Sequence, residues 1–126
     1  MPSKEDLNRL IHMLEAAREA LGYVQGLTRE DLRANRPIAH SVVRCLEIVG
    51  EAASKVSPRF REQCPAIDWQ NIVGMRNRLI HAYFDINLNI VWRTATEELP
   101  QLIAELEPIV KPPSQSPSGP RPAGNG

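Results

Sequence analysis

Residues 37–56 read PIAHSVVRCLEIVGEAASKV, and this stretch decides the fold class. Its apolar side chains recur at alternating steps of four and three residues, which places them on one face of an α-helix. The stripe consists of Val42, Leu46, Val49, Ala53 and Val56. Pro37 suits the first turn of this helix, because no N–H is needed there. Gly50, with Ala52 and Ala53 beside it, would let another helix approach closely.

The sequence before this stretch predicts a long helix and a short one. A periodic apolar face follows Ser3, which is a good N-cap residue. This face consists of Leu7, Leu10, Ile11, Leu14, Ala17 and Leu21. Thr28 and Asp31 have the spacing of a capping box, which predicts a short helix that runs to about Asn35.

The sequence after the central stretch predicts a connection and then a third long helix. Ser57 and Pro58 end the central helix, and the connection contains Phe60 and a turn at residues 64–65. Asp68 is a good N-cap for the third long helix. The apolar residues expected on that helix are Trp69, Ile72, Val73, Leu79 and Ile80.

A last helix is predicted to begin after Asn87, which can serve as its N-cap. Pro100 lies inside its apolar pattern and should kink the helix or split it. No strand alternation and no internal repeat occur in the sequence. We therefore predict an all-α, up-and-down bundle of four to five helices.

The end of the chain differs in composition from the rest. Residues 111–126 read KPPSQSPSGPRPAGNG, with almost no apolar side chain to bury. Such a segment is predicted to be a disordered tail. The remaining residues, 1–110, have the size of one ordinary domain.

Composition limits the classes of function. Fifteen basic and fifteen acidic residues give a net charge of zero, which argues against a general polyanion binder. A nuclease remains allowed, because a site needs only a local basic cluster. Cys45 is predicted to be a buried free thiol, and neither it nor Cys64 has a metal-site spacing. No pair of His, Cys or carboxylate side chains has the spacing of a metal site, so we expect no metal. No glycine-rich phosphate loop is present, so we expect no ATP bound in the P-loop manner and no cofactor.

The sequence also predicts the location of the protein. Lys4, Glu5 and Asp6 interrupt any apolar run near the N-terminus, so no secretory signal is expected. No stretch approaches the roughly 20 apolar residues needed to span a membrane. We therefore expect a cytoplasmic protein without a membrane partner.

The chemistry is expected to lie in residues 74–85, which read GMRNRLIHAYFD. On a helix with 100° per residue, Arg76 lies in the middle of the apolar stripe of the third helix. Asn77 and His81 are four residues apart and would share one flank of that stripe. If the helix continues, Tyr83 stacks over Arg76.

An arginine within an apolar face has a large desolvation cost unless it has a partner, and three interpretations of Arg76 are open. It pairs with a carboxylate on the central helix, for which Glu47 and Glu51 are candidates. Alternatively, the stripe borders a cleft or a subunit interface. Finally, the guanidinium group binds a phosphate, to which its planar geometry is well suited.

His81 is either a hydrogen-bonded structural residue or a proton donor and acceptor near neutral pH. Together with the arginine it supplies a cation for a phosphate and an acid or base, which RNA transesterification needs. Asn77 can orient the imidazole ring, and Arg78 points away as a solvated charge or an RNA-backbone contact. His12 and His40 have no motif around them and are expected to be structural or surface residues.

Three segments together identify a family. Arg76, His81 and Tyr83 have the Arg-x4-His-x-Tyr spacing of the HepT family in the HEPN superfamily. Residues 43–52 (VRCLEIVGEA) and 68–77 (DWQNIVGMRN) resemble the helices of that family, as do Trp92 and the Leu99-Pro100 pair. Ala82 stands where relatives often have glycine. The resemblance covers nearly everything before the tail.

This resemblance implies a HEPN fold of four or five helices and a homodimer with two motifs at a shared cleft. It also implies a metal-independent endoribonuclease that acts on tRNA or mRNA as the toxin of a type VII toxin–antitoxin system. Arg76 and His81 would be the catalytic residues. The implied partner is an MntA-type nucleotidyltransferase antitoxin, which would transfer AMP from ATP to Tyr83.

Two other functions fit the same residues. One is a non-catalytic HEPN module that binds a nucleotide or a protein through the same cleft. The other is a purely structural, dimerising helical bundle. A ribonuclease assay in the presence of EDTA separates the enzyme from both.

Overall fold

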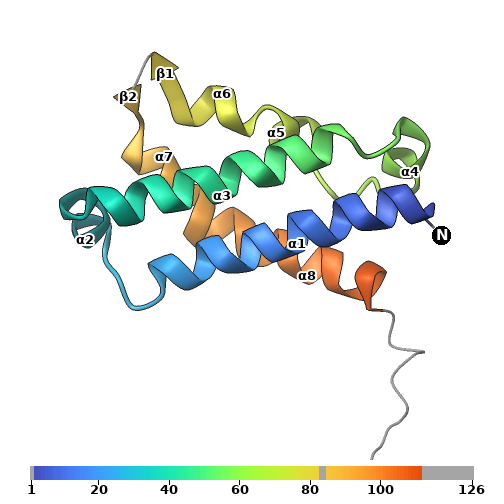
Figure 1. Cartoon of the computed structure of the whole chain (residues 1–126), viewed down its shortest axis with the longest axis horizontal. Coiled ribbons are helices and arrows are strands. Elements are labelled where there is room, and N and C mark those ends of the chain that lie inside the picture. The colour runs from blue at the N-terminus through green and yellow to red at the C-terminus, as the bar shows by residue number, and fades with distance from the viewer. Residues whose placement is uncertain (1, 83–84, 112–126) are drawn as a thin grey trace, which may run out of the picture.

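A computed structural model describes residues 2–82 and 85–111 (Figure 1). Its α-helices are α1 (Lys4–Val24), α2 (Arg29–Ala34), α3 (Arg36–Ser54), α4 (Pro58–Gln63), α5 (Trp69–Val73), α6 (Met75–Leu79), α7 (Leu88–Arg93) and α8 (Leu99–Val110). A π-helical segment, η1 (Thr94–Glu98), joins α7 to α8. Two short antiparallel strands, β1 (Ile80–Ala82) and β2 (Asp85–Ile86), follow α6. The mostly helical class is therefore as predicted, whereas the predicted tail beyond Lys111 lies outside the described residues.

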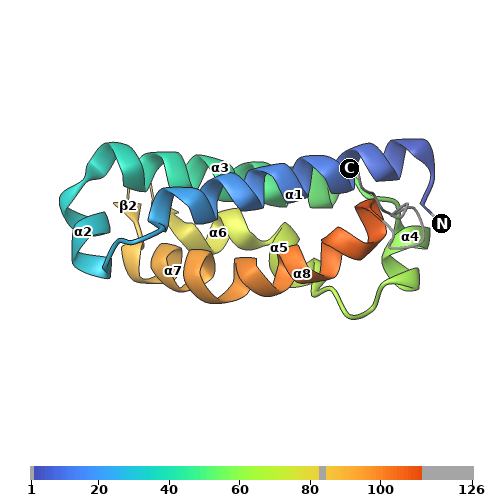
Figure 2. The ribbon, with the colours of Figure 1, turned by 90° about the horizontal axis from the view of Figure 1, so that it is seen from below.

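The described chain forms four rod-like units in two layers (Figures 1 and 2). Helices α1 and α3 lie antiparallel and side by side in one layer, and the α5–α6 and α7–η1–α8 units form the other. Consecutive units alternate in direction, so the arrangement is up-and-down. The strands and α2 lie at one end of the bundle, and α4 lies at the other.

Polar side chains begin these helices where the sequence predicts. The Ser3 hydroxyl accepts a hydrogen bond from the Asp6 N–H at 3.0 Å. Thr28 and Asp31 form the full capping box, with distances of 3.1 and 2.9 Å. The Asn87 side chain accepts from the Ile90 N–H at 3.1 Å. Each cap satisfies an N–H group that the first turn of a helix leaves without a partner.

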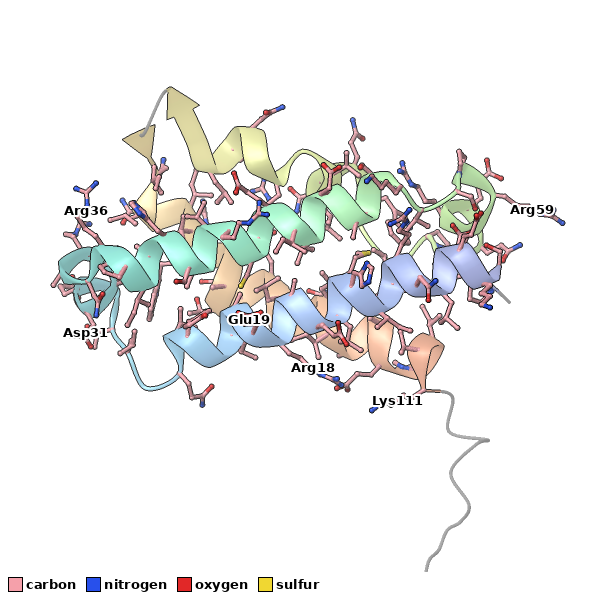
Figure 3. All side chains as sticks on the ribbon, viewed as in Figure 1. Arg18, Glu19, Asp31, Arg36, Arg59 and Lys111 are labelled. Carbon is pink, nitrogen blue, oxygen red and sulfur yellow. The ribbon has the colours of Figure 1, made fainter. Side chains whose placement is uncertain are left out.

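The core lies between the layers and consists mainly of aliphatic side chains. The predicted stripe of α3 is buried along its length, and Val42, Leu46, Val49 and Ala53 have no exposed surface. Leucines of α1 pack against this stripe, and leucines of α8 pack against α1 in the same core. Most charged side chains lie outside, such as Asp31 and Arg36 near the α2 end and Arg59 at the α4 end (Figure 3).

Gly50 brings α3 close to the unit that carries the motif. A Cβ atom built on Gly50 would lie 3.1 Å from the carbonyl oxygen of Ile72 and 4.0 Å from the Cβ of Met75. The first distance is shorter than ordinary van der Waals contact, so only glycine fits without displacing the backbone of α5. The close approach expected at Gly50 is therefore present.

The prediction of a third long helix is wrong, because the chain leaves helical geometry twice. Gly74 separates α5 from α6, and glycine is a poor residue for a helix interior. Val73, expected in the apolar stripe, is 36% exposed. After Leu79 the chain becomes strand β1, and Ile80 pairs with Ile86. The Leu79 carbonyl accepts a hydrogen bond from the Asn87 N–H at 2.9 Å, which ties the end of α6 to the start of α7.

The connection after α3 holds a short helix that the sequence reasoning missed. Ser57 caps α4, and Phe60 is buried. The Arg61 guanidinium group donates to the carbonyl oxygens of Val56, Ala53 and Ser54 at distances between 2.9 and 3.1 Å. Arg61 thus satisfies carbonyl groups at the end of α3.

Pro100 splits the last helix, as predicted, next to a π-helical turn. The Leu99 N–H donates to the Thr94 carbonyl, which is an i to i−5 bond. Proline has no N–H and crowds the carbonyl four residues earlier, so regular α-helical bonding is interrupted just before Pro100. The wider turn also suits the spacing of the buried residues, which recur every four positions at Val91, Ala95 and Leu99.

Asp6 makes the stability of the folded state depend on pH. Burial opposes its ionisation, but hydrogen bonds from the Ser57 hydroxyl and N–H, at 2.6 and 2.9 Å, outweigh that effect, so the pKa of Asp6 lies below its ordinary value. A lowered carboxyl pKa stabilises the folded state above the ordinary pKa, and this contribution disappears as the pH falls through the folded pKa.

We expect Asp6→Asn to lower the free energy of unfolding at pH 7 by about 1–3 kcal/mol, since hydrogen bonds to a charged group are lost. The parent begins to lose this contribution as the pH falls below the ordinary carboxyl pKa of about 4, and the loss is complete below the lowered folded pKa, so the difference between the two proteins should shrink with falling pH. Urea unfolding at pH 7 and pH 3 measures both effects. Glu5→Gln, an exposed neighbour on α1, is the control. A constant difference between parent and variant at both pH values would contradict the assignment.

Candidate functional site

The motif residues lie on two consecutive elements rather than on one helix. Arg76 is the second residue of α6, and His81 is the middle residue of β1. Helix α6 is fixed by Met75, which is 1% exposed, and by Leu79, which is fully buried. These two residues are four apart, so they form one face, and α6 packs against α3 and α7. The backbone that carries Arg76 is therefore anchored to the core.

The predicted helical geometry of the motif is wrong beyond Leu79. Asn77 and His81 do not share a helix flank, because α6 ends before His81. Stacking of Tyr83 over Arg76 required the helix to continue, and it does not continue past Leu79. Tyr83 itself lies outside the described residues. The helix ends at Leu79 because the backbone from Ile80, a β-branched residue, pairs as a strand with Ile86.

Among the motif side chains, those of Asn77 and Arg78 are described, whereas those of Arg76 and His81 are not. Asn77 is exposed, and its N–H donates to the Gly74 carbonyl at 3.1 Å. An exposed amide next to the start of β1 is free to meet a ligand. Whether Asn77 orients His81 stays a prediction.

Arg78 is in a different setting from the solvated charge that the sequence suggested. Its Nη2 atom lies 3.6 Å from Oε1 of Glu98, the last residue of η1. The Nε and Nη2 atoms of Arg78 are shielded from solvent and have no hydrogen-bond partner among the described residues. Glu98 also accepts a hydrogen bond from Asn71 Nδ2 at 3.0 Å. This group could not be predicted from the sequence, because Glu98 is 20 or more positions away from both partners and belongs to no motif.

The two carboxylates proposed as partners of Arg76 both lie on α3 and face other cations as well. Glu47 Oε1 is 3.9 Å from Arg44 Nη1, and Glu51 Oε2 is 3.5 Å from Lys55 Nζ. They line a groove of about 430 Å³ on the outer side of α1 and α3. The interpretation of Arg76 as an ion-pair partner of this helix stays open.

Other candidate chemistries find little support in the described residues. Cys45 is buried as predicted, and burial together with the nearby Glu19 raises its pKa to about 11, so the thiol is protonated at neutral pH. His12 and His40 are both exposed. Among residues 2–82 and 85–111, no group of three His, Cys, Asp or Glu side chains is placed to hold a metal ion. Within the same residues no helix is both long enough and apolar enough to cross a membrane.

Sequence comparison with known proteins finds matches that include the motif and most of the helical bundle. The model of the family "Ribonuclease HepT-like" matches residues 13–109, which include α6, β1 and most of the bundle. A Methanocaldococcus jannaschii protein provisionally named RNase MJ1216 is 36% identical over 111 residues, which are 88% of this chain and 92% of the relative. A second from the same organism, provisionally named RNase MJ0125, is 34% identical, covering 88% of this chain and 96% of the relative.

A third relative, "Probable ribonuclease HepT" of Thermococcus cleftensis, is 34% identical over 102 residues, covering 78% of this chain and 93% of its own. No solved structure matches the chain. The family match extends over well more than half of the 126 residues and encloses the motif. The chain therefore belongs to the HepT-like ribonuclease family and is a ribonuclease.

Proposed function

We propose that the chain is a metal-independent endoribonuclease that acts in the cytoplasm as the toxin of a type VII toxin–antitoxin system. The observation that carries the proposal is the family match, which runs through residues 13–109 and includes the complete Arg-x4-His-x-Tyr motif. The structure supports it because Arg76 and His81 lie on the adjoining elements α6 and β1, and α6 packs against α3 and α7.

In the proposed mechanism, Arg76 binds the scissile phosphate and stabilises the negative charge that increases in the transition state. His81 either removes the proton from the ribose 2′-hydroxyl group or protonates the leaving 5′-oxygen. Attack of the 2′-oxygen on phosphorus would break the bond to the 5′-oxygen. The products are a 2′,3′-cyclic phosphate and a 5′-hydroxyl group. Asn77 would support the imidazole, and no step needs a metal ion.

The proposal includes a second copy of the chain. We expect a symmetric homodimer in which two motifs face a shared cleft, so that two His81 residues divide the acid and base roles. Val73, exposed on α5 just before the motif helix, is an apolar side chain that such a contact would cover. Sedimentation at micromolar concentration is expected to give twice the mass of the chain. A monomer under those conditions would contradict this part of the proposal.

The proposed regulatory partner is an MntA-type nucleotidyltransferase. It would transfer AMP from ATP to the hydroxyl oxygen of Tyr83, with release of pyrophosphate, and so add a phosphodiester charge and a nucleoside next to the site. The added charge would compete with RNA phosphate for Arg76. RNA, whether tRNA or mRNA, is the proposed substrate.

The test is cleavage of RNA by the purified chain in EDTA. The parent should cleave, and Arg76→Lys should lose most activity, on the order of 10²–10³ in rate, because an ammonium group cannot form two parallel bonds to a phosphate. Arg59→Lys at the opposite end of the bundle is the matched control (Figure 3). An inactive parent that still binds RNA or nucleotide would favour the non-catalytic module. A fully active Arg76→Lys would favour the structural ion pair.

A further inference from the structure

The Arg78 side chain extends from α6 toward η1, with part of its guanidinium group shielded from solvent. Its Nε and Nη2 atoms are buried, and Nη2 faces Glu98 Oε1 at 3.6 Å. To reach an RNA phosphate with this edge, the guanidinium group would have to leave Glu98 and expose a carboxylate that is two-thirds buried. Arg78 is thus poorly placed to bind substrate through these atoms.

Glu98 is held in place by a second contact. Asn71 Nδ2 donates to the same Oε1 atom at 3.0 Å, and the Asn71 N–H is itself bound by the Asp68 carboxylate at 3.2 Å. The Asn71–Glu98–Arg78 group therefore joins α5, η1 and α6. Because one carboxylate oxygen serves both partners, loss of either partner changes the environment of the other.

The Asn71–Glu98–Arg78 group lies beside a groove in the bundle. A groove of about 280 Å³ lies between α5 and the start of α8, so apolar side chains do not fill the space there. Its lining includes Asn71, Met75 and Glu98. The π-helical turn ends at Glu98, next to this gap. Beside this groove, the Arg78–Glu98 pair adds a direct polar link between η1 and α6 to the apolar packing of Met75 and Leu79.

We propose that Arg78 is a positioning residue: through its ion pair with Glu98 it holds α6, and with it Arg76, against η1. The inference rests on the proposed function, because the position of Arg76 matters only if Arg76 binds the phosphate. Catalysis is sensitive to such placement, and a displacement of about 1 Å can cost on the order of 10²-fold in rate.

Steady-state cleavage in EDTA separates a positioning role from an RNA contact. Glu98→Gln removes the negative charge with almost no change in side-chain volume, Arg78→Gln removes the positive charge and shortens the side chain, and the double variant removes both charges. For a positioning role, all three lower kcat by a similar factor, roughly 10-fold to 10²-fold, and KM stays unchanged. The double variant should be no worse than the singles, since both remove the same link. Arg18→Gln removes the exposed ion pair with Glu107 between α1 and α8 and is the matched control.

An RNA contact predicts other results. Arg78→Gln would then raise KM with kcat retained, and the slope of log affinity against log salt would fall by about 0.7. Glu98→Gln would leave kcat intact. Either pattern, or additive losses in the double variant, overturns the inference while leaving the proposed function in place.

Amide hydrogen exchange tests the link without using activity. Exchange in residues 75–79 should become faster by the same factor in Arg78→Gln and in Glu98→Gln, and it should be unaffected in Arg18→Gln. Unchanged exchange in α6 overturns the inference even if the enzyme is active. If the parent cleaves no RNA, the proposed function fails, and equal exchange in parent and variants would show that the link fails as well.

Discussion

His81→Ala is expected to abolish RNA cleavage, with a loss on the order of 10²–10⁴ in rate, while the protein stays folded. The imidazole is the group in this motif that can exchange a proton near neutral pH, and alanine removes it entirely. Folding should survive because α6 is anchored by Met75 and Leu79, which the substitution leaves untouched. The measurement is the rate of 2′,3′-cyclic phosphate formation in EDTA, together with the thermal unfolding midpoint.

His12→Ala is the matched control for this prediction, because His12 is an exposed histidine on α1. It should cleave at the parent rate. A folded His81→Ala protein that cleaves as fast as the parent would remove His81 from the mechanism. Equal losses in both variants would point to an effect on stability rather than on chemistry.

Tyr83→Phe is expected to remove AMP transfer completely and to leave RNA cleavage intact. Phenylalanine keeps the aromatic ring but lacks the oxygen to which the AMP phosphorus would bond. Under the proposed toxin–antitoxin function, cells that express this variant together with the antitoxin should stop growing, because the ribonuclease would no longer be blocked. Intact-mass spectrometry after incubation with the antitoxin and ATP should show added AMP on the parent and none on the variant.

The chain offers a close control for this experiment in its other tyrosine. Tyr23 lies exposed on α1, and its hydroxyl group donates to Glu19 Oε2 at 3.2 Å. Tyr23→Phe should be modified and neutralised like the parent. Equal AMP addition to the parent and to Tyr83→Phe would place the acceptor elsewhere, and loss of addition in Tyr23→Phe would do the same.

Capping residues and apolar spacing were enough to predict most of the bundle. Ser3, Thr28, Asp68 and Asn87 each cap the helix expected of them, because a side-chain acceptor near a free N–H is a local effect. The apolar stripe of α3 could be predicted from the sequence for a similar reason, because it repeats over several turns of one helix.

The motif region was harder to predict because short-range preferences compete there. Periodicity continued through residues 72–80 in the sequence, whereas Gly74 and the pairing of Ile80 with Ile86 interrupt the helix. Strand pairing depends on a partner that the spacing of one segment does not reveal. The residues of the motif were recognisable by type and order, and their relative geometry was not.

The Arg78–Glu98 pair shows a second limit of prediction from the sequence. Its two members are 20 positions apart and belong to different elements, so only the folded chain brings them together. A residue that looked like a surface cation therefore has a carboxylate partner and buried nitrogen atoms.

The contact at Gly50 offers a practical way to obtain weakened enzyme. A ribonuclease that degrades the RNA of its expression host is difficult to produce alone, and mutation of the motif would remove the residues that we propose bind RNA. Alanine or serine at position 50 would press on the Ile72 carbonyl, 3.1 Å from the added carbon, and shift the backbone that leads into α6. Activity would then fall in steps with the size of the side chain, while every residue proposed to contact RNA stays native. Such attenuated proteins would be suited to trapping uncleaved RNA in complexes for crystallisation.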